Sequence, residues 1–194
     1  MLRWILIGIG GFIVIVLAVL GALYYLFTRP PAELSEMREV NITEEASKSF
    51  DEKMEHFRKA LEGGGEVEIE LTEEEVSSKI LDVAKEKLEG TPLKPEKIMI
   101  NFKDGEVEVG GEVKVNWGPN PTVNIWGRGE VEVEEGKIKY KLKELKMGSV
   151  PGPVMNLLKK YIPEEGKEGE IKIKDLEALD IEIKEGKIIL KGKR

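Results

Sequence analysis

Residues 98 to 147 constrain the fold more than any other part of the chain, because apolar and polar residues alternate there through runs separated by turn signals. Strict alternation places every second side chain on the same face of a strand. Asp104-Gly105 and Glu135-Gly136 are typical of tight hairpin turns, and pairing across the first turn sets Phe102 opposite Val107. The pattern therefore predicts an antiparallel meander with one apolar face.

The central connection of the meander determines how its two hairpins pair. Residues 118 to 122 form a longer loop. Inward residues must pair with inward residues on its two sides, which sets Trp117 opposite Val123 and therefore Gly111 opposite Gly129. A slip of one residue would turn every apolar side chain to the other face. Agreement among the turns therefore supports this register.

Glycines at inward positions are the most informative detail of the predicted sheet. Gly111, Gly127 and Gly129 stand where the alternation expects large apolar residues. Glycine weakens a strand unless the chain must bend or another group must approach closely. We therefore expect a strongly coiled sheet that wraps around either a helix of the same chain or a ligand. A change of phase between Leu142 and Leu145 also predicts a β-bulge.

The first part of the chain is typical of a membrane anchor. Residues 4–27 are a run of 24 residues without a charged side chain, which would extend about 36 Å as a helix. We assign residues 1–28 to a single transmembrane helix and residues 29–42 to a tether. The N-terminus is expected in the cytoplasm and residues 43–194 outside the cell membrane. A cleaved signal peptide is the alternative, but the run is long for one and no clear Ala-x-Ala site follows it.

Helix signals flank the meander. A capping threonine opens an amphipathic helix over residues 43–62, and residues 66–194 hold the sheet and the other helices. A short strand runs into the capping box from Thr72 to Glu75, which opens a helix that ends near Leu88. Pro153 begins a later helix, and alternation near the C-terminus predicts further strands.

Composition excludes several classes of function. The chain has a formal net charge of −7 and no basic stripe, so nucleic acid is not an expected partner. It has no cysteine, and its one histidine, His56, lies on the polar side of the helix over residues 43–62. We therefore expect no enzymatic activity, no metal site and no cofactor. Abundant Lys, Glu, Ile and Val without any glutamine indicate a thermophilic source.

One tryptophan on the outward face needs an explanation. Val123 and Ile125 face inward, so Trp126 faces outward together with Asn124. An outward tryptophan either packs beneath a neighbouring element or contacts a membrane or a protein partner. The sequence leaves both possibilities open.

Three features resemble a known family. They are the single N-terminal anchor, the helix start Leu71-Thr72-Glu73-Glu74-Glu75-Val76 before a meander, and the segment Met147-Gly148-Ser149-Val150-Pro151-Gly152-Pro153-Val154-Met155-Asn156-Leu157-Leu158 after it. Over roughly residues 67 to 163, this arrangement resembles the YpmS-type bacterial envelope proteins, in which an LGxLPxP segment follows the sheet and opens a helix. Met147 and Gly152 depart from that pattern. The resemblance implies a tubular lipid-binding (TULIP)-like domain, in which a coiled sheet wraps a long helix and encloses an apolar groove for lipid.

Together these inferences predict an α+β fold, in which a strongly curved antiparallel sheet wraps around the helix over residues 73–88. The helix after Pro153 is expected to close one end. We expect the interior to hold the acyl part of a membrane lipid or a lipid-linked envelope precursor, and to present or transfer it. The candidate ligand contacts are Val76, Ile80, Val83, Leu88, Val113, Ile125, Tyr140, Val154, Leu157 and Tyr161. The alternative is a non-enzymatic envelope scaffold that has a close-packed core and binds a protein partner.

Overall fold

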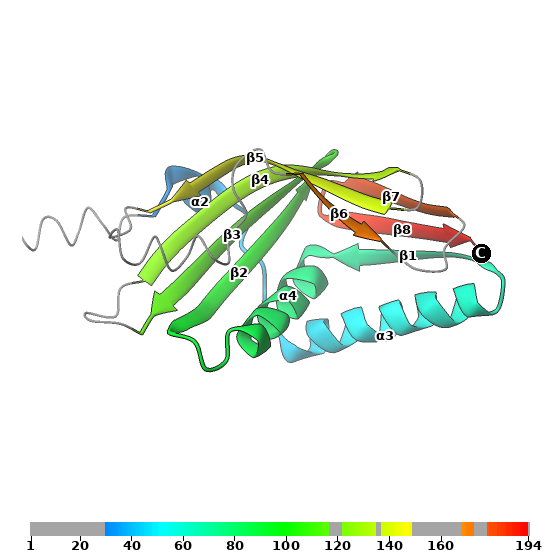
Figure 1. The fold of residues 1–194 in the computed structure, drawn as a ribbon, viewed down its shortest axis with the longest axis horizontal. Helices are drawn as coiled ribbons and strands as arrows, with labels where there is room; N and C mark the ends of the chain where they lie inside the picture. Colours follow the sequence, from blue (N-terminus) through cyan, green and yellow to red (C-terminus); the bar gives the residue numbers. More distant parts are fainter. Residues whose placement is uncertain (1–29, 117–121, 135–136, 149–167, 173–177, 194) are drawn as a thin grey trace, which may run out of the picture.

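Two antiparallel sheets form the frame of the protein, and helices pack against them (Figure 1). The structure is a computed structural model that describes residues 30–116, 122–134, 137–148, 168–172 and 178–193. The predicted α+β class with antiparallel pairing is confirmed.

The five-stranded sheet has the order β2 (Leu93–Lys103), β3 (Glu106–Val115), β4 (Thr122–Glu134), β5 (Lys137–Met147) and β6 (Glu168–Lys172). The three-stranded sheet has the order β1 (Glu66–Thr72), β8 (Lys187–Lys193) and β7 (Ala178–Lys184), and the helices are α2 (Ala32–Glu36), α3 (Glu44–Glu62) and α4 (Glu73–Lys87).

Both long helices begin where the sequence predicts. At the start of α3, the Thr43 hydroxyl accepts the Ala46 N–H at 3.1 Å. At the start of α4, Thr72 and Glu75 form the predicted capping box, in which each side chain accepts the backbone N–H of the other residue. These caps satisfy backbone groups that the helices themselves cannot pair.

Pairing within each hairpin of the meander follows the predicted register. Phe102 pairs with Val107 across the first turn, and β4 and β5 pair in the predicted register beyond the second turn. The predicted β-bulge is confirmed: Arg128 pairs with Glu144, whereas the next residue, Gly129, pairs with Leu142.

The register between β3 and β4 differs from the prediction. Gly111 pairs with Ile125 instead of Gly129, a displacement of four residues. The physical reason is that β3 ends at Val115 and β4 begins at Thr122, so the connection is longer than the predicted loop. Because the displacement is even, each side chain keeps its predicted face.

The predicted wrapping of a strongly curved sheet around the helix over residues 73–88 is wrong. α4 lies along β2, at the margin of the five-stranded sheet, and α3 covers β1 and β8 (Figure 1). The inward glycines do not receive a helix. A Cβ at Gly129 would lie 2.7 Å from the Lys141 carbonyl oxygen of β5, and one at Gly111 would lie 3.2 Å from the Lys97 carbonyl oxygen of β2. These two glycines therefore allow neighbouring strands to approach closely.

The segment predicted as a tether packs on the outward face of the five-stranded sheet. Its apolar residues form a buried cluster with two residues of that sheet: Leu34, Met37, Val40, Met99 and Trp126. A Cβ at Gly110 would lie 2.5 Å from both Leu34 Cδ1 and Met37 Sδ, so glycine makes room for α2. Trp126 is 3% exposed and therefore packs beneath a neighbouring element, one of the two possibilities that the sequence left open.

Within the described ranges, no helix is long and apolar enough to cross a membrane. The anchor predicted over residues 4–27 and the helix predicted after Pro153 lie outside those ranges. The buried clusters of the described residues are built from residues 34 to 190.

Replacing Gly110 with valine should displace α2, because the added methyl groups would take the space of Leu34 and Met37. We expect the free energy of unfolding to fall by about 1–3 kcal/mol. Backbone amides of residues 32–42 should also exchange faster with deuterium. Gly127→Val is the control, since a Cβ at Gly127 meets its neighbours at 3.4 Å or more. Equal loss of protection at residues 32–42 in both variants would contradict the role assigned to Gly110.

Candidate apolar groove and the neighbouring polar cluster

An apolar groove with a volume of about 320 Å³ lies on β3, β4 and β5. We call the face that carries it the inner face; α2 packs on the opposite face of this sheet. Alternation along the three strands places valine, isoleucine and leucine side chains on this face, whereas most outward positions are polar or charged. The lining residues are Val107, Val109, Ile125, Gly127, Arg128, Gly129, Glu130, Val131, Lys141, Leu142 and Leu145.

Hydrophobic clusters bound the groove at two ends. At one end, Val107 and Val131 pack against the cluster that contains Phe102. At the other end, Ile125 packs against the cluster that contains Val115. Phe102 is 2% exposed and Val115 is fully buried, so both ends are closely packed. The groove is the less filled stretch between them.

The groove leaves apolar surface in contact with water. Val109, in the lining, is 42% exposed, as is Ile80 on the neighbouring helix α4. Removing apolar surface from water is favourable by about 25 cal/mol per Å². Burial of this surface would therefore favour the binding of a ligand or a partner that covered it.

The predicted contacts on α4 do not line the groove. Val76 packs in the cluster at the Phe102 end, and Leu88, just after the helix, packs in the cluster at the Val115 end. Val83 is partly buried and Ile80 is exposed. The stripe predicted on this helix therefore flanks the inner face and does not cover it.

The predicted contacts on the sheet are divided. Ile125 lines the groove, whereas Val113 packs in the cluster at the Val115 end. Tyr140 pairs with the lining residue Val131 across β4 and β5. The other predicted contacts, Val154, Leu157 and Tyr161, lie outside the described residues.

Sequence reasoning missed most of the lining. Val107, Val109, Val131 and Leu142 belong to the inward face that alternation predicts, but they were not proposed as ligand contacts. The missing information was the position of α4. Because α4 lies along β2, it leaves β4 and β5 without its cover.

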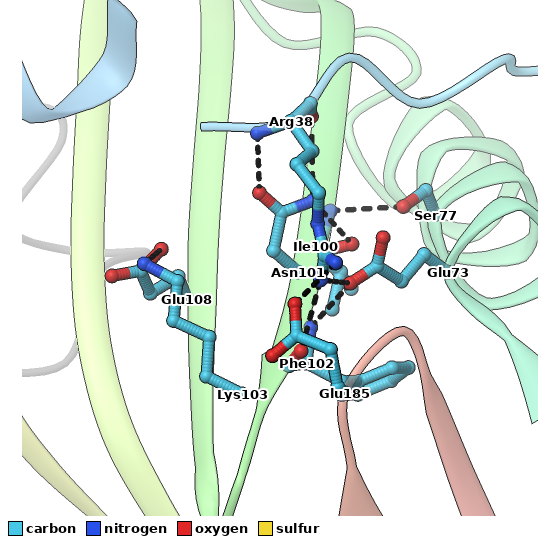
Figure 2. Close-up of polar contacts among 9 residues, drawn as sticks. All are labelled: Arg38, Glu73, Ser77, Ile100, Asn101, Phe102, Lys103, Glu108 and Glu185. Carbon is cyan, nitrogen blue, oxygen red and sulfur yellow. Dashed lines mark hydrogen bonds and ion pairs between the residues drawn. The ribbon is translucent and has the colours of Figure 1, made fainter. Parts of the chain in front are cut away.

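A polar cluster joins the segment after α2, helix α4 and both sheets (Figure 2). The Arg38 guanidinium contacts the Glu73 carboxylate at 2.6 Å and also pairs with Glu185. It donates a further hydrogen bond to the Phe102 carbonyl oxygen at 3.0 Å. The side chain of Asn101, which is fully buried, accepts the Arg38 N–H at 2.8 Å and donates to the Arg38 carbonyl oxygen at 3.3 Å. The Asn101 side chain thus pairs with both the N–H and the C=O of Arg38, as the backbone of a neighbouring strand would.

Helix α4 supplies hydrogen-bond acceptors to the outer edge of β2. The Ser77 hydroxyl accepts the Ile100 N–H at 2.9 Å, and the Glu73 carboxylate accepts the Phe102 N–H at 2.7 Å. The turn between β7 and β8 continues this pairing, because the Gly186 N–H donates to the Phe102 carbonyl oxygen at 3.1 Å. These bonds satisfy an edge that would otherwise be open to another strand. They also hold the two sheets together.

A second buried carboxylate, Glu75, links α4 to α3. It pairs with Lys53 at 2.7 Å, and it accepts hydrogen bonds from the Ser49 hydroxyl at 2.5 Å and the Thr72 N–H at 2.9 Å. Burial raises the pKa of Glu75, but these hydrogen bonds outweigh burial and lower the pKa below its ordinary value of 4.5. Glu75 is therefore held as a carboxylate by the packing of two helices.

Other candidates for chemistry are paired or exposed. The buried Glu108 pairs with Lys103 at 2.8 Å (Figure 2), and His56 is exposed on α3. In the part of the chain that the structure describes, no group of His, Cys, Asp and Glu residues could hold a metal ion. A second hollow of about 390 Å³, on β1, β7 and β8, is lined mostly by charged residues, of which Glu68 and Lys191 pair at 3.6 Å. The apolar groove is therefore the stronger candidate site.

Comparison of the chain with protein-family models, with curated proteins and with solved structures finds no match. Function is therefore inferred from the groove, the polar cluster and the predicted anchor.

Replacing Arg38 with alanine should leave the Glu73 carboxylate buried without its cationic partner. We expect the free energy of unfolding, measured by urea denaturation, to fall by about 2–4 kcal/mol. Adding Glu73→Gln removes the buried charge but keeps an acceptor for the Phe102 N–H. The double variant should therefore be more stable than Arg38→Ala alone. Arg58→Ala, at an exposed arginine of α3, is the matched control, and an equal loss in both arginine variants would refute this account.

Replacing Glu75 with glutamine should reduce the dependence of stability on pH. Folding lowers the pKa of Glu75, so the unfolded chain binds this proton more readily. The stability that the carboxylate contributes is complete above pH 4.5 and is lost as the pH falls through the folded-state pKa. The variant should be less stable than the wild type by about 1–3 kcal/mol at neutral pH.

Urea denaturation across the acid range measures this effect, and the gap between Glu75→Gln and the wild type should narrow as the pH falls below 4.5. Glu74→Gln, at the exposed neighbouring position, should follow the wild type. A gap that stays constant with pH would show that Glu75 acts by shape alone.

Proposed function

We propose that this protein is a membrane-anchored, extracytoplasmic lipid-binding protein. It holds the acyl part of a lipid or a lipid-linked envelope precursor in the apolar groove, and it acts by binding and presentation, without catalysis. The observation that carries the proposal is the groove of about 320 Å³ on the inner face, where Val109 is 42% exposed. Small-molecule pockets are about 300–1,000 Å³ in volume, so the groove is large enough for a small apolar ligand.

The lining suits an acyl chain better than a polar ligand. The inward side chains are those of valine, isoleucine and leucine, with glycine at two positions. Burying a polar group without a hydrogen-bond partner costs about 1–3 kcal/mol, whereas burying one methylene group gains about 0.8 kcal/mol. Arg128, one of the charged residues of the lining, already pairs with Glu144. The lining therefore favours the binding of an apolar chain over that of a polar ligand.

The predicted anchor would keep the groove near a bilayer. The predicted span ends at Phe27, and α2 begins at Ala32 and packs on the sheet. Glu33 on this helix pairs with Lys146 of β5 at 2.5 Å. A connection this short favours exchange of an acyl chain with the adjacent membrane over capture of a ligand from solution.

The resemblance to the YpmS-type envelope proteins supports the same class of ligand. The segment that carries it, residues 147–158, follows directly on β5, which supplies Leu142 and Leu145 to the groove. The TULIP-like assignment remains a prediction, because this segment lies mostly outside the described residues.

An envelope scaffold is the second candidate, and the packed clusters at both ends of the groove favour it. In that case the chain would fill its own interior and bind a protein partner on its outer surface. Trp126, the side chain first considered for such a contact, lies beneath α2. The two candidates differ in whether the groove takes up lipid.

Full-length protein purified in a mild detergent should carry about one lipid per chain, detected by native mass spectrometry. Val109→Lys should abolish this binding, because an acyl chain in the groove would strip water from the new charge. The variant should still fold, since position 109 is 42% exposed and the lysine can reach water in the ligand-free protein. Ile80→Lys is the matched control, because Ile80 is equally exposed and lies outside the groove lining.

Loss of lipid in Val109→Lys alone supports the groove. Loss in Ile80→Lys alone would move the site to the face of α4 that the sequence predicts. A wild-type protein that carries no lipid, and takes up none from added phospholipid vesicles, would overturn the proposal and favour the scaffold.

A further inference from the structure

We propose that one end of the five-stranded sheet faces the membrane and contacts the phosphate groups of its lipids. We call it the near end, because β2 and β4 begin there, and β3 and β5 end there, at Leu93, Thr122, Val115 and Met147. The far end carries the turn between β2 and β3. The inference rests on the membrane anchor of the proposed function, but not on the binding of lipid in the groove.

The position of α2 determines where the chain enters the domain. The Glu33 carboxylate pairs at 2.5 Å with the ammonium group of Lys146, the last residue but one of β5. That ammonium group lies 5.4 Å from the centre of the Trp126 ring, and Leu34 is buried in the same cluster as Trp126. Figure 1 shows α2 beside the tip of the β5 arrow, away from the C-terminus. The start of α2 is therefore held close to the near end.

The predicted span leaves few residues before α2. It ends at Phe27, and α2 begins at Ala32, so the connection extends at most about 18 Å. Lys137, at the other end of β5, lies about 30 Å from Lys146. A domain with its far end against the bilayer would hold α2 farther from the membrane than this connection can reach. The membrane must therefore meet either the near end or a side of the domain.

Exposed lysines favour the near end over a side. Lys85 and Lys87 lie in the last turn of α4, and Leu88, just after the helix, packs in the cluster that contains Val115. Lys94 is the second residue of β2. These three lysines are exposed and have no ion-pair partner among the described residues. They can therefore bind phosphate without losing an existing contact.

Cations on the outward face of the sheet are, by contrast, already engaged. Arg128 pairs with Glu144, and Lys143 pairs with Glu130. Each would have to give up or share a carboxylate in order to bind a phosphate. This side of the domain is therefore the weaker candidate for contact with the membrane.

The near end suits separate phosphates better than a large polyanion. Glu86 and Glu89 are exposed beside the lysines of α4, so the surface is mixed in charge. At physiological salt, charges are screened beyond about 8 Å, and only direct contact distinguishes a lysine from its acidic neighbours. A lysine ammonium group on its flexible stem can donate three hydrogen bonds to one phosphate. Headgroups that move laterally in a bilayer can meet each lysine in this way.

The test uses fluorescent labels on single cysteines, since the chain has none of its own. Asn116→Cys places a label at the near end, just after β3, and Asp104→Cys places one at the far end, just before β3. Both positions are exposed. Full-length protein is reconstituted in vesicles of phosphatidylcholine and phosphatidylglycerol that carry acceptor-labelled headgroups. Energy transfer should be stronger from Asn116→Cys than from Asp104→Cys.

Removing lysines should reduce this difference in energy transfer. Each lysine near an anionic leaflet favours contact about fivefold, so Lys85→Gln/Lys87→Gln should shift the domain away from the docked orientation. Salt at about 1 M should act in the same way, because it screens charges beyond about 3 Å. Arg58→Gln/Lys59→Gln is the matched control, since it removes two exposed cations from the part of α3 that packs on β8. Circular dichroism establishes that each variant is folded.

The outcomes separate this inference from the proposed function. Equal transfer from both labels, or stronger transfer from Asp104→Cys, would overturn the assignment of the near end. A difference that survives both Lys85→Gln/Lys87→Gln and 1 M salt would overturn the contact with phosphate. Val109→Lys should abolish lipid binding in the groove but leave the difference in transfer unchanged. Protein that does not stay with the vesicles would overturn the predicted anchor and this inference together.

Discussion

The outer edge of β2 is the constraint on which the rest of the structure depends. An edge strand exposes N–H and C=O groups that must find partners. Ser77 and Glu73 of α4 supply acceptors, and Gly186 of the β7–β8 turn supplies a donor. Arg38 compensates the charge of Glu73, so that this acceptor can remain buried. One polar cluster thereby fixes both sheets, helix α4 and the segment after α2 relative to one another (Figure 2).

The same arrangement explains why none of the described helices covers the inner face of β4 and β5. Hydrogen bonds to β2 hold α4 at the margin of the five-stranded sheet, and α2 packs on the opposite face. The helix with the most apolar contact to the three-stranded sheet, α3, is committed to β1 and β8. No described helix is therefore left to cover β4 and β5 on the inner side, where the apolar groove lies.

Features that depend on neighbours in sequence were predictable, and features that depend on distant contacts were not. The capping box at Thr72 and the bulge beside Gly129 follow from local chemistry. The predicted pairing of β3 with β4 was wrong by four residues. Alternation determines which face each side chain occupies, but it does not determine how many residues the connecting loop contains. The position of α4 depends on the contact of Glu73 with Phe102, whereas Glu73 alone looks like an ordinary helix-start acid. The candidate contacts on α4 were misplaced for the same reason: an apolar stripe does not reveal which strand it meets.

The packing of α2 over Gly110 also makes the segment predicted as a tether a part of the folded domain. Met37 and Arg38 are fixed to the sheet, so a pulling force applied near residue 30 would reach β2 before the chain around α2 could stretch. A flexible segment of this length would let a domain reach a broad volume around its attachment point, whereas Leu34, Met37 and Val40 are buried against the sheet. If residues 4–27 span a bilayer as predicted, residues 32–40 would then belong to the domain and would not act as a spacer between it and the bilayer.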